Sequence, residues 1–152
     1  MGKHETPTLP LYERDFAAWS KDQAEKLRKR MDADVDWENV AEEIESLGRS
    51  DKREIESRLK VLLVHLLKLK FQPGKKKPGW KSTLNEQRRR IQKLIKESPS
   101  LRSHPNAVLG EEYEYARSDA AEETGLDLSV FPIGCPFSIE NILDLSFYPD
   151  GN

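Results

Sequence analysis

The sequence has very few of the side chains that build disulfides and zinc sites. Its 152 residues include a single cysteine, Cys135, and three histidines, His4, His65 and His104. One cysteine cannot form an internal disulfide, and this set cannot supply a zinc site made of cysteine and histidine. We therefore expect a protein of a reducing compartment, with neither a bound metal nor a cofactor.

The chain also lacks an apolar run long enough to cross a membrane. Its longest run, residues 61–67, is interrupted by His65, whereas a membrane-spanning helix needs about 20 apolar residues. We recognise no signal peptide either. These absences lead us to expect a cytoplasmic protein without a membrane partner.

What the sequence does contain is charge and helical periodicity. Hydrophobic residues make up 36% of the chain and charged residues 34%. The apolar residues recur every three or four positions, which is typical of amphipathic helices, and no run alternates as a half-buried strand does. The composition therefore predicts a soluble all-α protein.

The periodicity predicts five main helices and a short sixth one. We expect a flexible N-terminal tail at residues 1–10 and a single helical domain over residues 11–149. Gly48 and Ser50 have the residue types that end one helix and cap the next, so we predict an antiparallel hairpin there. Gly125 is expected to end the fifth helix, and Ser138 to cap the short one. The predicted main helices span residues 12–31, 36–47, 51–71, 79–97 and 107–124.

The helix predicted at residues 51–71 is apolar on nearly all sides, which places it at the centre of the bundle. The helix before it has one apolar face, made by Trp37, Val40, Ala41, Ile44 and Leu47, which we expect to be buried. All three tryptophans, Trp19, Trp37 and Trp80, take inward positions. We therefore interpret them as core residues and not as stacking platforms.

Several fragments, in order along the chain, resemble one bacterial family. They are WENVAEEIESLGRS, LLVHLLKLKFQP, the spacing from Trp80 to Arg88 with its QR pair, SPSL, and Y..A....A..TGL followed by FP..CP. Together they resemble the family known as domain of unknown function twenty-nine, over about residues 12–149. The resemblance implies a small, all-helical, cytoplasmic bacterial protein and implies no activity. The sequence departs from the family pattern before Trp80, where Pro78 and Gly79 replace a better helix-capping serine.

Polar residues interrupt the central helix. His65 and Lys68 lie on one strip beside its main apolar face, and burying them without partners costs several kcal/mol. We predict that they join Glu43 and Arg88 in one hydrogen-bonded network between helices. The simplest role of such a network is to fix the register of three helices. Alternatively, it forms a catalytic or ligand-binding site, or Glu43, Glu45 and His65 hold a metal, although no ligand spacing supports a metal.

Charge is distributed unevenly along the chain. Residues 68–96 hold eleven lysines and arginines against Glu86 alone, and residues 110–152 hold ten acids against Arg117 alone. These two segments either neutralise each other or leave a basic face that binds a polyanion. The candidate polyanion-binding residues are Lys75, Lys76, Lys77, Arg89, Lys93 and Lys96.

Three functions follow from these features. The first is a non-enzymatic interaction or regulatory module that binds a protein partner or a second copy of itself. The second is an enzyme or small-ligand binder that uses Glu43, His65, Lys68 and Arg88, which requires an open pocket and a partly exposed His65. The third is a nonspecific nucleic-acid binder that uses the basic loop and the fourth predicted helix.

Overall fold

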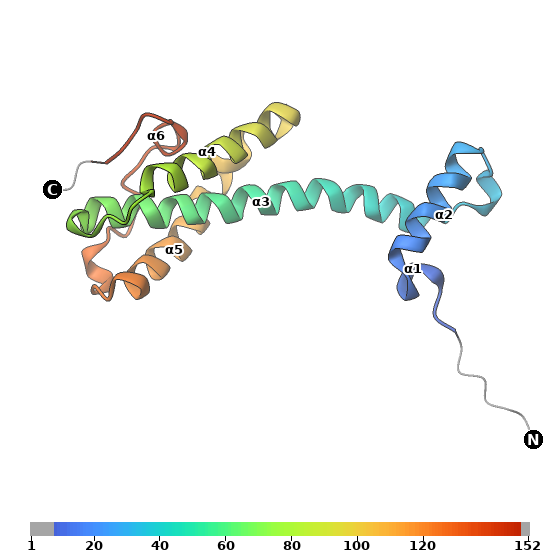
Figure 1. The fold of residues 1–152 in the computed structure, drawn as a ribbon, viewed down its shortest axis with the longest axis horizontal. Helices are drawn as coiled ribbons and strands as arrows, with labels where there is room; N and C mark the ends of the chain where they lie inside the picture. Colours follow the sequence, from blue (N-terminus) through green and yellow to red (C-terminus); the bar gives the residue numbers. More distant parts are fainter. Residues whose placement is uncertain (1–7, 150–152) are drawn as a thin grey trace, which may run out of the picture. The chain divides into compact units, whose positions relative to one another are not determined.

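The computed structural model describes residues 8–149, and it is all-α as the sequence predicts. Helices make up 76% of the structure, and residues 8–149 contain no strand. Most of the predicted N-terminal tail, residues 1–7, lies outside the described residues. The α-helices are α1 (Leu11–Arg14), α2 (Phe16–Arg28), α3 (Trp37–Phe71), α4 (Trp80–Glu97), α5 (His104–Thr124) and α6 (Ile139–Leu143) (Figure 1).

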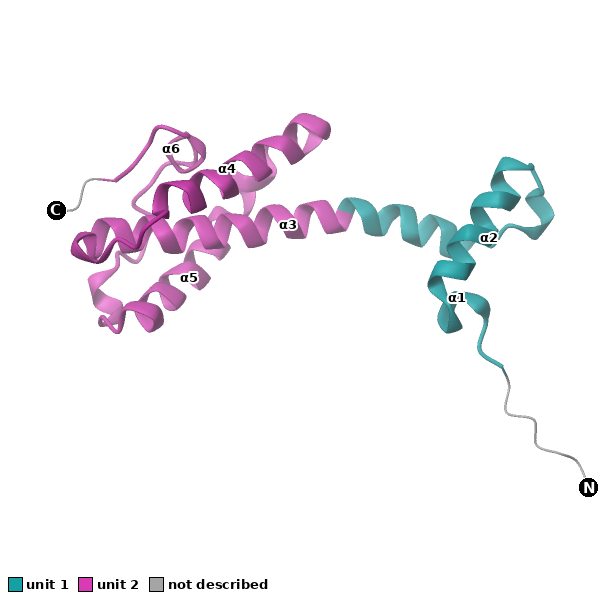
Figure 2. Ribbon diagram, in the orientation of Figure 1, with its two compact units in different colours: residues 1–48 teal, residues 49–152 magenta. Residues whose placement is uncertain are grey.

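The chain forms two compact units, residues 1–48 and residues 49–152 (Figure 2). Unit 1 contains α1, α2 and the start of α3, and unit 2 contains the rest of α3 with α4, α5 and α6. Short 3₁₀ turns at Asp32–Asp34, Pro73–Lys75, Pro99–Leu101 and Leu128–Val130 connect the helices.

The helix predicted at residues 12–31 is divided in two at Asp15. The backbone of Asp15 is not helical, with φ −150° and ψ 88°, and its side chain accepts a hydrogen bond from the Ala18 backbone N–H at 3.0 Å. Asp15 therefore caps α2 and ends α1, because a carboxylate satisfies one of the free N–H groups of a helix start.

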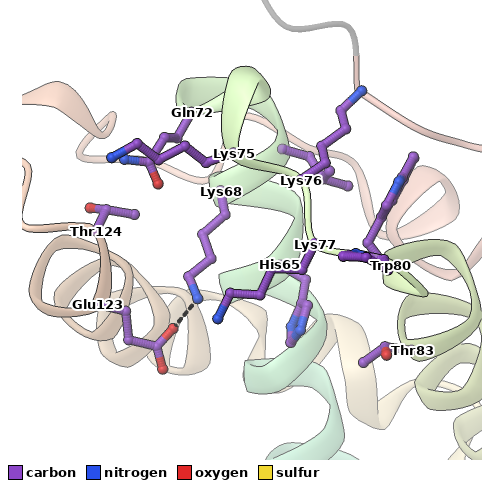
Figure 3. Close-up of a pocket in the computed structure, with 12 residues that line it drawn as sticks. His65, Lys68, Gln72, Lys75, Lys76, Lys77, Trp80, Thr83, Glu123 and Thr124 are labelled. Atoms are coloured by element: carbon purple, nitrogen blue, oxygen red, sulfur yellow. Dashed lines mark ion pairs between the residues drawn. The ribbon is translucent and has the colours of Figure 1, made fainter.

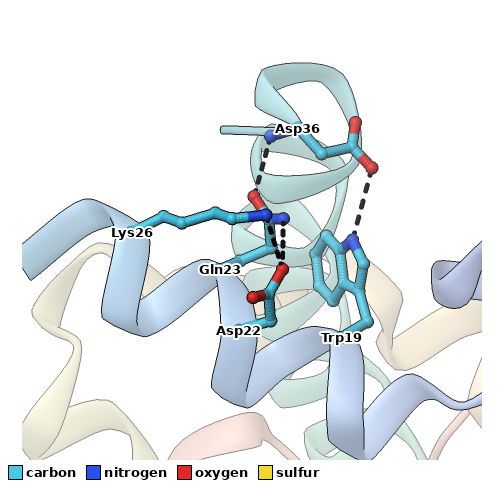
Figure 4. A network of polar contacts seen from close by, with 5 residues as sticks. All are labelled: Trp19, Asp22, Gln23, Lys26 and Asp36. Carbon is cyan, nitrogen blue, oxygen red and sulfur yellow. Dashed lines mark hydrogen bonds and ion pairs between the residues drawn. The ribbon is translucent and has the colours of Figure 1, made fainter. Parts of the chain in front are cut away.

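Gln23, the polar residue on the apolar side of α2, has a structural explanation. It is 6% exposed, and its Oε1 accepts from the Asp36 backbone N–H at 2.7 Å (Figure 4). Trp19 donates from Nε1 to the Asp36 carboxylate at 3.3 Å. The Asp36 carboxylate in turn accepts from Asn39, which lowers the pKa of Asp36. These bonds attach α2 to the beginning of α3.

The hairpin predicted at Gly48 is wrong. Residues Trp37–Phe71 form one continuous helix, and Gly48 does not have the positive φ of a helix-ending glycine. A glycine inside a helix costs only about 1 kcal/mol relative to alanine. No proline follows Gly48 to stop the helix, so the helical hydrogen bonds continue through it.

The apolar face predicted for residues 36–47 is not buried within unit 1. Trp37, Ile44 and Leu47 are 54%, 64% and 70% exposed, and we call these three residues the apolar stripe. Asn39, Val40 and Glu43 are instead partly buried. At the start of α3, the partly buried side of the helix is therefore partly polar, and the exposed side is apolar.

Unit 2 has its core around the second part of α3, as predicted. Leu59, Leu62, Leu63, Leu66 and Leu67 are each completely buried. They belong to one hydrophobic cluster with residues of α4, α5, α6 and the C-terminal segment. Removing this many large apolar side chains from water is the main stabilising contribution to a fold of this size.

Most of the remaining helix ends agree with the sequence. Gly125 ends α5 with a φ of 70°, and the Ser138 side chain accepts from the Asn141 backbone N–H at the start of α6. α5 begins at His104, three residues before its predicted start, because Pro105 is tolerated in the first turn of a helix.

Candidate functional site

One pocket in unit 2 collects much of the polar chemistry that the sequence predicts. It has a volume of about 410 Å³ and lies between the end of α3, the following loop, the start of α4 and the end of α5 (Figure 3). Its lining residues from these four segments include, in chain order, His65, Lys68, Lys75, Lys76, Lys77, Trp80, Thr83 and Glu123.

His65 and Lys68 enter the pocket from the same side of α3, one turn apart. Nδ1 of His65 lies 2.8 Å from the Val61 carbonyl oxygen. Because a carbonyl oxygen only accepts, Nδ1 carries a hydrogen, and a neutral His65 then keeps its lone pair on Nε2. His65 is partly exposed, so the second function's requirement of an open pocket at this residue is met.

Lys68 pairs with Glu123 of α5, and not with the predicted Glu43. Its Nζ lies 2.5 Å from Glu123 Oε2, and the two side chains are 33% and 51% exposed. This ion pair joins the basic and the acidic segments of the sequence. A partly exposed pair contributes about 1 kcal/mol or less, so it orients Lys68 more than it stabilises the fold.

The turn after α3 places three lysines in the loop that leads to α4. Pro73 starts a 3₁₀ turn that ends at Lys75, and Gly79 then takes a left-handed conformation, with φ 78°, before α4 begins. Lys75, Lys76 and Lys77 all line the pocket. The residues that line the pocket thus include four lysines and a single acid, Glu123. This excess of positive charge gives the pocket a positive electrostatic potential.

Trp80 forms an aromatic wall at the other side of the pocket. Its ring meets the Tyr148 ring edge-on at a centroid distance of 5.4 Å, and the ammonium of Lys76 lies 5.1 Å from the indole centroid. The predicted core role of Trp80 is therefore incomplete: it is half-buried, packs on the core and also lines the pocket. Trp37, in contrast, is an exposed residue of the apolar stripe.

Arg88 has a different environment from the one predicted. It is fully buried, and its guanidinium donates to the backbone carbonyls of Ile142 at 2.7 Å and Phe147 at 2.8 Å, and to Asn85 Oδ1 at 3.1 Å. Burial lowers the pKa of Arg88 from its ordinary value. Its side chain attaches the C-terminal segment to α4 and is not among those that line the pocket.

Glu43 also has another partner. It belongs to unit 1, where it accepts a hydrogen bond from the Tyr12 hydroxyl, and this bond raises the pKa of Tyr12 to about 12. In the described part of the chain, the four residues of the predicted network thus share no partner and do not pair with one another. Helical-wheel positions correctly indicated the side of its helix on which each residue lies. They could not indicate the partners, because the prediction assumed a turn at Gly48, and the helix continues through that residue.

The other basic candidates lie on α4. Arg89, Lys93 and Lys96 are exposed, and they are not among the residues that line the pocket. Lys93 lies 4.0 Å from Glu97, and the neighbouring Arg90 lies 3.4 Å from Glu86. Two acids, one near each end of this basic surface, therefore each offset one base, which weakens its attraction for a polyanion.

Metal and thiol chemistry find no support in residues 8–149. This part of the chain has no group of three or more histidine, cysteine or acidic side chains placed to hold a metal ion. Burial raises the pKa of Cys135, whose Sγ donates to the Phe137 carbonyl, and a thiol with a raised pKa is a poor nucleophile. None of the described helices is long and apolar enough to cross a bilayer.

Comparison with known proteins gives a family and no activity. No curated protein and no solved structure matches the chain significantly. A family model described as "Domain of unknown function DUF29" matches residues 11–148, which is nearly the whole chain and agrees with the resemblance in the sequence fragments. The chain therefore belongs to the DUF29 family.

Proposed function

We propose that unit 2 binds a small anionic ligand in the pocket lined by His65, Lys68 and the loop lysines. The observation that carries the proposal is that one cavity is lined by four lysines from two neighbouring segments, α3 and the loop after it. This proposal retains His65 and Lys68 from the predicted site, omits Glu43 and Arg88, and includes no covalent step.

Electrostatics supports an anion over a neutral ligand. The ammonium groups of Lys68, Lys75, Lys76 and Lys77 repel one another, and Glu123 offsets only one of them. A bound phosphate or carboxylate relieves this repulsion. Lysine ammonium groups bind phosphate as point charges with several donors each, so they need no exact fork geometry.

The size of the cavity favours a small ligand over a nucleic-acid strand. About 410 Å³ lies within the range of pockets that enclose small molecules. A strand needs a continuous positive track, whereas on α4 the basic candidates are flanked by Glu86 and Glu97, which pair with Arg90 and Lys93. Nonspecific nucleic-acid binding is therefore the weaker interpretation.

Titration calorimetry with inorganic pyrophosphate tests the proposal. We expect binding at low salt that weakens as salt rises, because the attraction is electrostatic. The variant Lys75→Ala/Lys77→Ala should bind about tenfold more weakly, since each exposed ion pair contributes roughly 0.7 kcal/mol.

The matched control is Lys93→Ala/Lys96→Ala, which removes the same charge from exposed positions that do not line the pocket. It should bind pyrophosphate like the unmodified protein. Equal weakening in the two double variants would show that net charge, and not the pocket, attracts the anion, and would contradict the proposal.

The apolar stripe favours a second function, self-association. Trp37, Ile44 and Leu47 are spaced by seven and three residues, as in the seam of a coiled coil, and all are more than half exposed. A second copy of the chain supplies a helix with the same spacing. Self-association of this kind would make the chain a protein-binding module, and we propose that it acts in the bacterial cytoplasm, as the sequence resemblance implies.

Sedimentation equilibrium tests self-association. We expect a dimer that dissociates on dilution, and a monomer for Ile44→Asp/Leu47→Asp, because two buried carboxylates disfavour an apolar interface. Glu38→Gln, at an exposed position near the start of the same helix, serves as the control. A monomeric unmodified protein over the whole concentration range would refute this second function.

A further inference from the structure

The pocket lined by the four lysines also has an aromatic wall, formed by Trp80. An aromatic wall beside positive charge favours some anionic ligands over others. We infer that the ligand carries both a phosphate group and a planar ring, the combination found in nucleoside phosphates. This inference rests on the proposed anion binding, and it adds a role for Trp80 that charge alone does not require.

Trp80 is held in place by residues that do not line the pocket. Its ring packs edge-on against Tyr148, and the Tyr148 hydroxyl accepts from Asn85 Nδ2 at 2.8 Å. Asn85 also accepts from the buried Arg88. The indole is therefore supported by a hydrogen-bonded chain that reaches the core, so little side-chain freedom is lost when a ligand stacks on it.

Lys76 connects the aromatic wall to the anion site. Its ammonium lies 5.1 Å from the centroid of the indole of Trp80, and the same residue lines the pocket with Lys75 and Lys77 (Figure 3). A phosphate competes for this ammonium with the indole, because a charge-assisted hydrogen bond is stronger than an exposed cation–π contact. Lys81 also lies over the indole, 5.4 Å from its centroid, so moving Lys76 to the phosphate removes one of two cations from the ring and makes room there for a planar group.

The rest of the pocket suits a ligand larger than phosphate. A volume of about 410 Å³ is far more than one or two phosphate groups need. Gln72 and Thr83 place an amide and a hydroxyl on the wall, and Nε2 of His65 adds a further hydrogen-bonding atom. Such groups fit the hydroxyls and ring nitrogens that a nucleoside adds to a phosphate.

The test compares two ligands that share a diphosphate. Pyrophosphate carries the charge alone, and adenosine diphosphate adds a ribose and a planar base. We expect adenosine diphosphate to bind the unmodified protein at least about fivefold more tightly, since a base stacked on an aromatic side chain contributes at least this factor. An alkyl diphosphate, which is apolar but not planar, should bind less tightly than adenosine diphosphate.

Variants at Trp80 identify the residue responsible. Trp80→Leu should reduce the ratio of the adenosine diphosphate affinity to the pyrophosphate affinity to about one, and Trp80→Tyr should restore most of the ratio. Trp37→Leu, which removes a tryptophan of unit 1, should change neither affinity. Circular dichroism checks that each variant folds.

The outcomes separate the two proposals. If neither diphosphate binds the unmodified protein, the anion site itself is refuted. If pyrophosphate binds and adenosine diphosphate binds no more tightly, the anion site stands and the aromatic inference is overturned. A preference for adenosine diphosphate that persists in a folded Trp80→Leu also overturns it. If Trp80→Leu does not fold, the ratios for the three diphosphates with the unmodified protein decide the question.

Discussion

Replacing Arg88 with alanine is expected to destabilise unit 2 by about 3 to 5 kcal/mol, enough to unfold much of a marginally stable protein. The guanidinium is fully buried, and it satisfies the carbonyls of Ile142 and Phe147 in the C-terminal segment. Without it, each buried acceptor that is left unsatisfied costs about 1 to 3 kcal/mol. The loss of the buried side chain itself adds a cavity.

Arg89→Ala is the matched control for this change. Arg89 is the next residue of α4 and is exposed, so its replacement should alter the free energy of unfolding by no more than about 0.5 kcal/mol. Arg88→Lys should fall between the two, because one ammonium cannot reach all the acceptors of a guanidinium. Denaturant unfolding followed by circular dichroism measures all three. Equal stability of Arg88→Ala and Arg89→Ala would contradict the assigned role.

Leu62→Ala is expected to destabilise unit 2 by about 2 to 5 kcal/mol. Leu62 is completely buried in the core around α3, so the substitution removes apolar contacts and leaves a cavity. Leu47→Ala, on the same helix but 70% exposed, should change the free energy of unfolding of the monomer by less than about 0.5 kcal/mol.

The comparison is made at low protein concentration, where self-association through the apolar stripe does not add to the stability of Leu47. A cost for Leu47→Ala as large as that for Leu62→Ala would mean that the first part of α3 is buried in the monomer. That result would contradict the described exposure of the stripe.

The sequence was sufficient to predict the core of unit 2, because the relevant signal is local. Residues 59–69 are apolar on nearly every side of the helix, and such a helix is buried whatever surrounds it. Gly125 and Ser138 were likewise predictable as helix signals. The residue type and its position in the helical turn determine whether a side chain is buried in the core and where a helix begins or ends.

Gly48 was not predictable in the same way. A glycine near a serine fits a helix stop, but it also fits a helix interior at a cost of about 1 kcal/mol. The continuity of the helix on both sides decided between these two possibilities. Once Gly48 is helical, the chain does not turn back, and the apolar side of residues 37–47 has no antiparallel neighbour in α3.

The site was predictable in part. His65, Lys68 and the loop lysines were identified as candidates because each is unusual in its place, either polar in an apolar helix or clustered after it. Their partners were not identified. Glu123 lies far along the sequence, in a helix whose surface carries many acids. Arg88 pairs mainly with backbone carbonyls, which carry no sequence signature.

The central claim is that the lysines of the pocket, and not those of the α4 surface, bind the anion. The most direct measurement is the rate at which each lysine reacts with a small amine-labelling reagent, with and without saturating pyrophosphate, read by mass spectrometry. We predict slower labelling of Lys68, Lys75, Lys76 and Lys77 and unchanged labelling of Lys93 and Lys96. Unchanged rates at the four pocket lysines, or protection at Lys93 and Lys96 instead, would contradict the account.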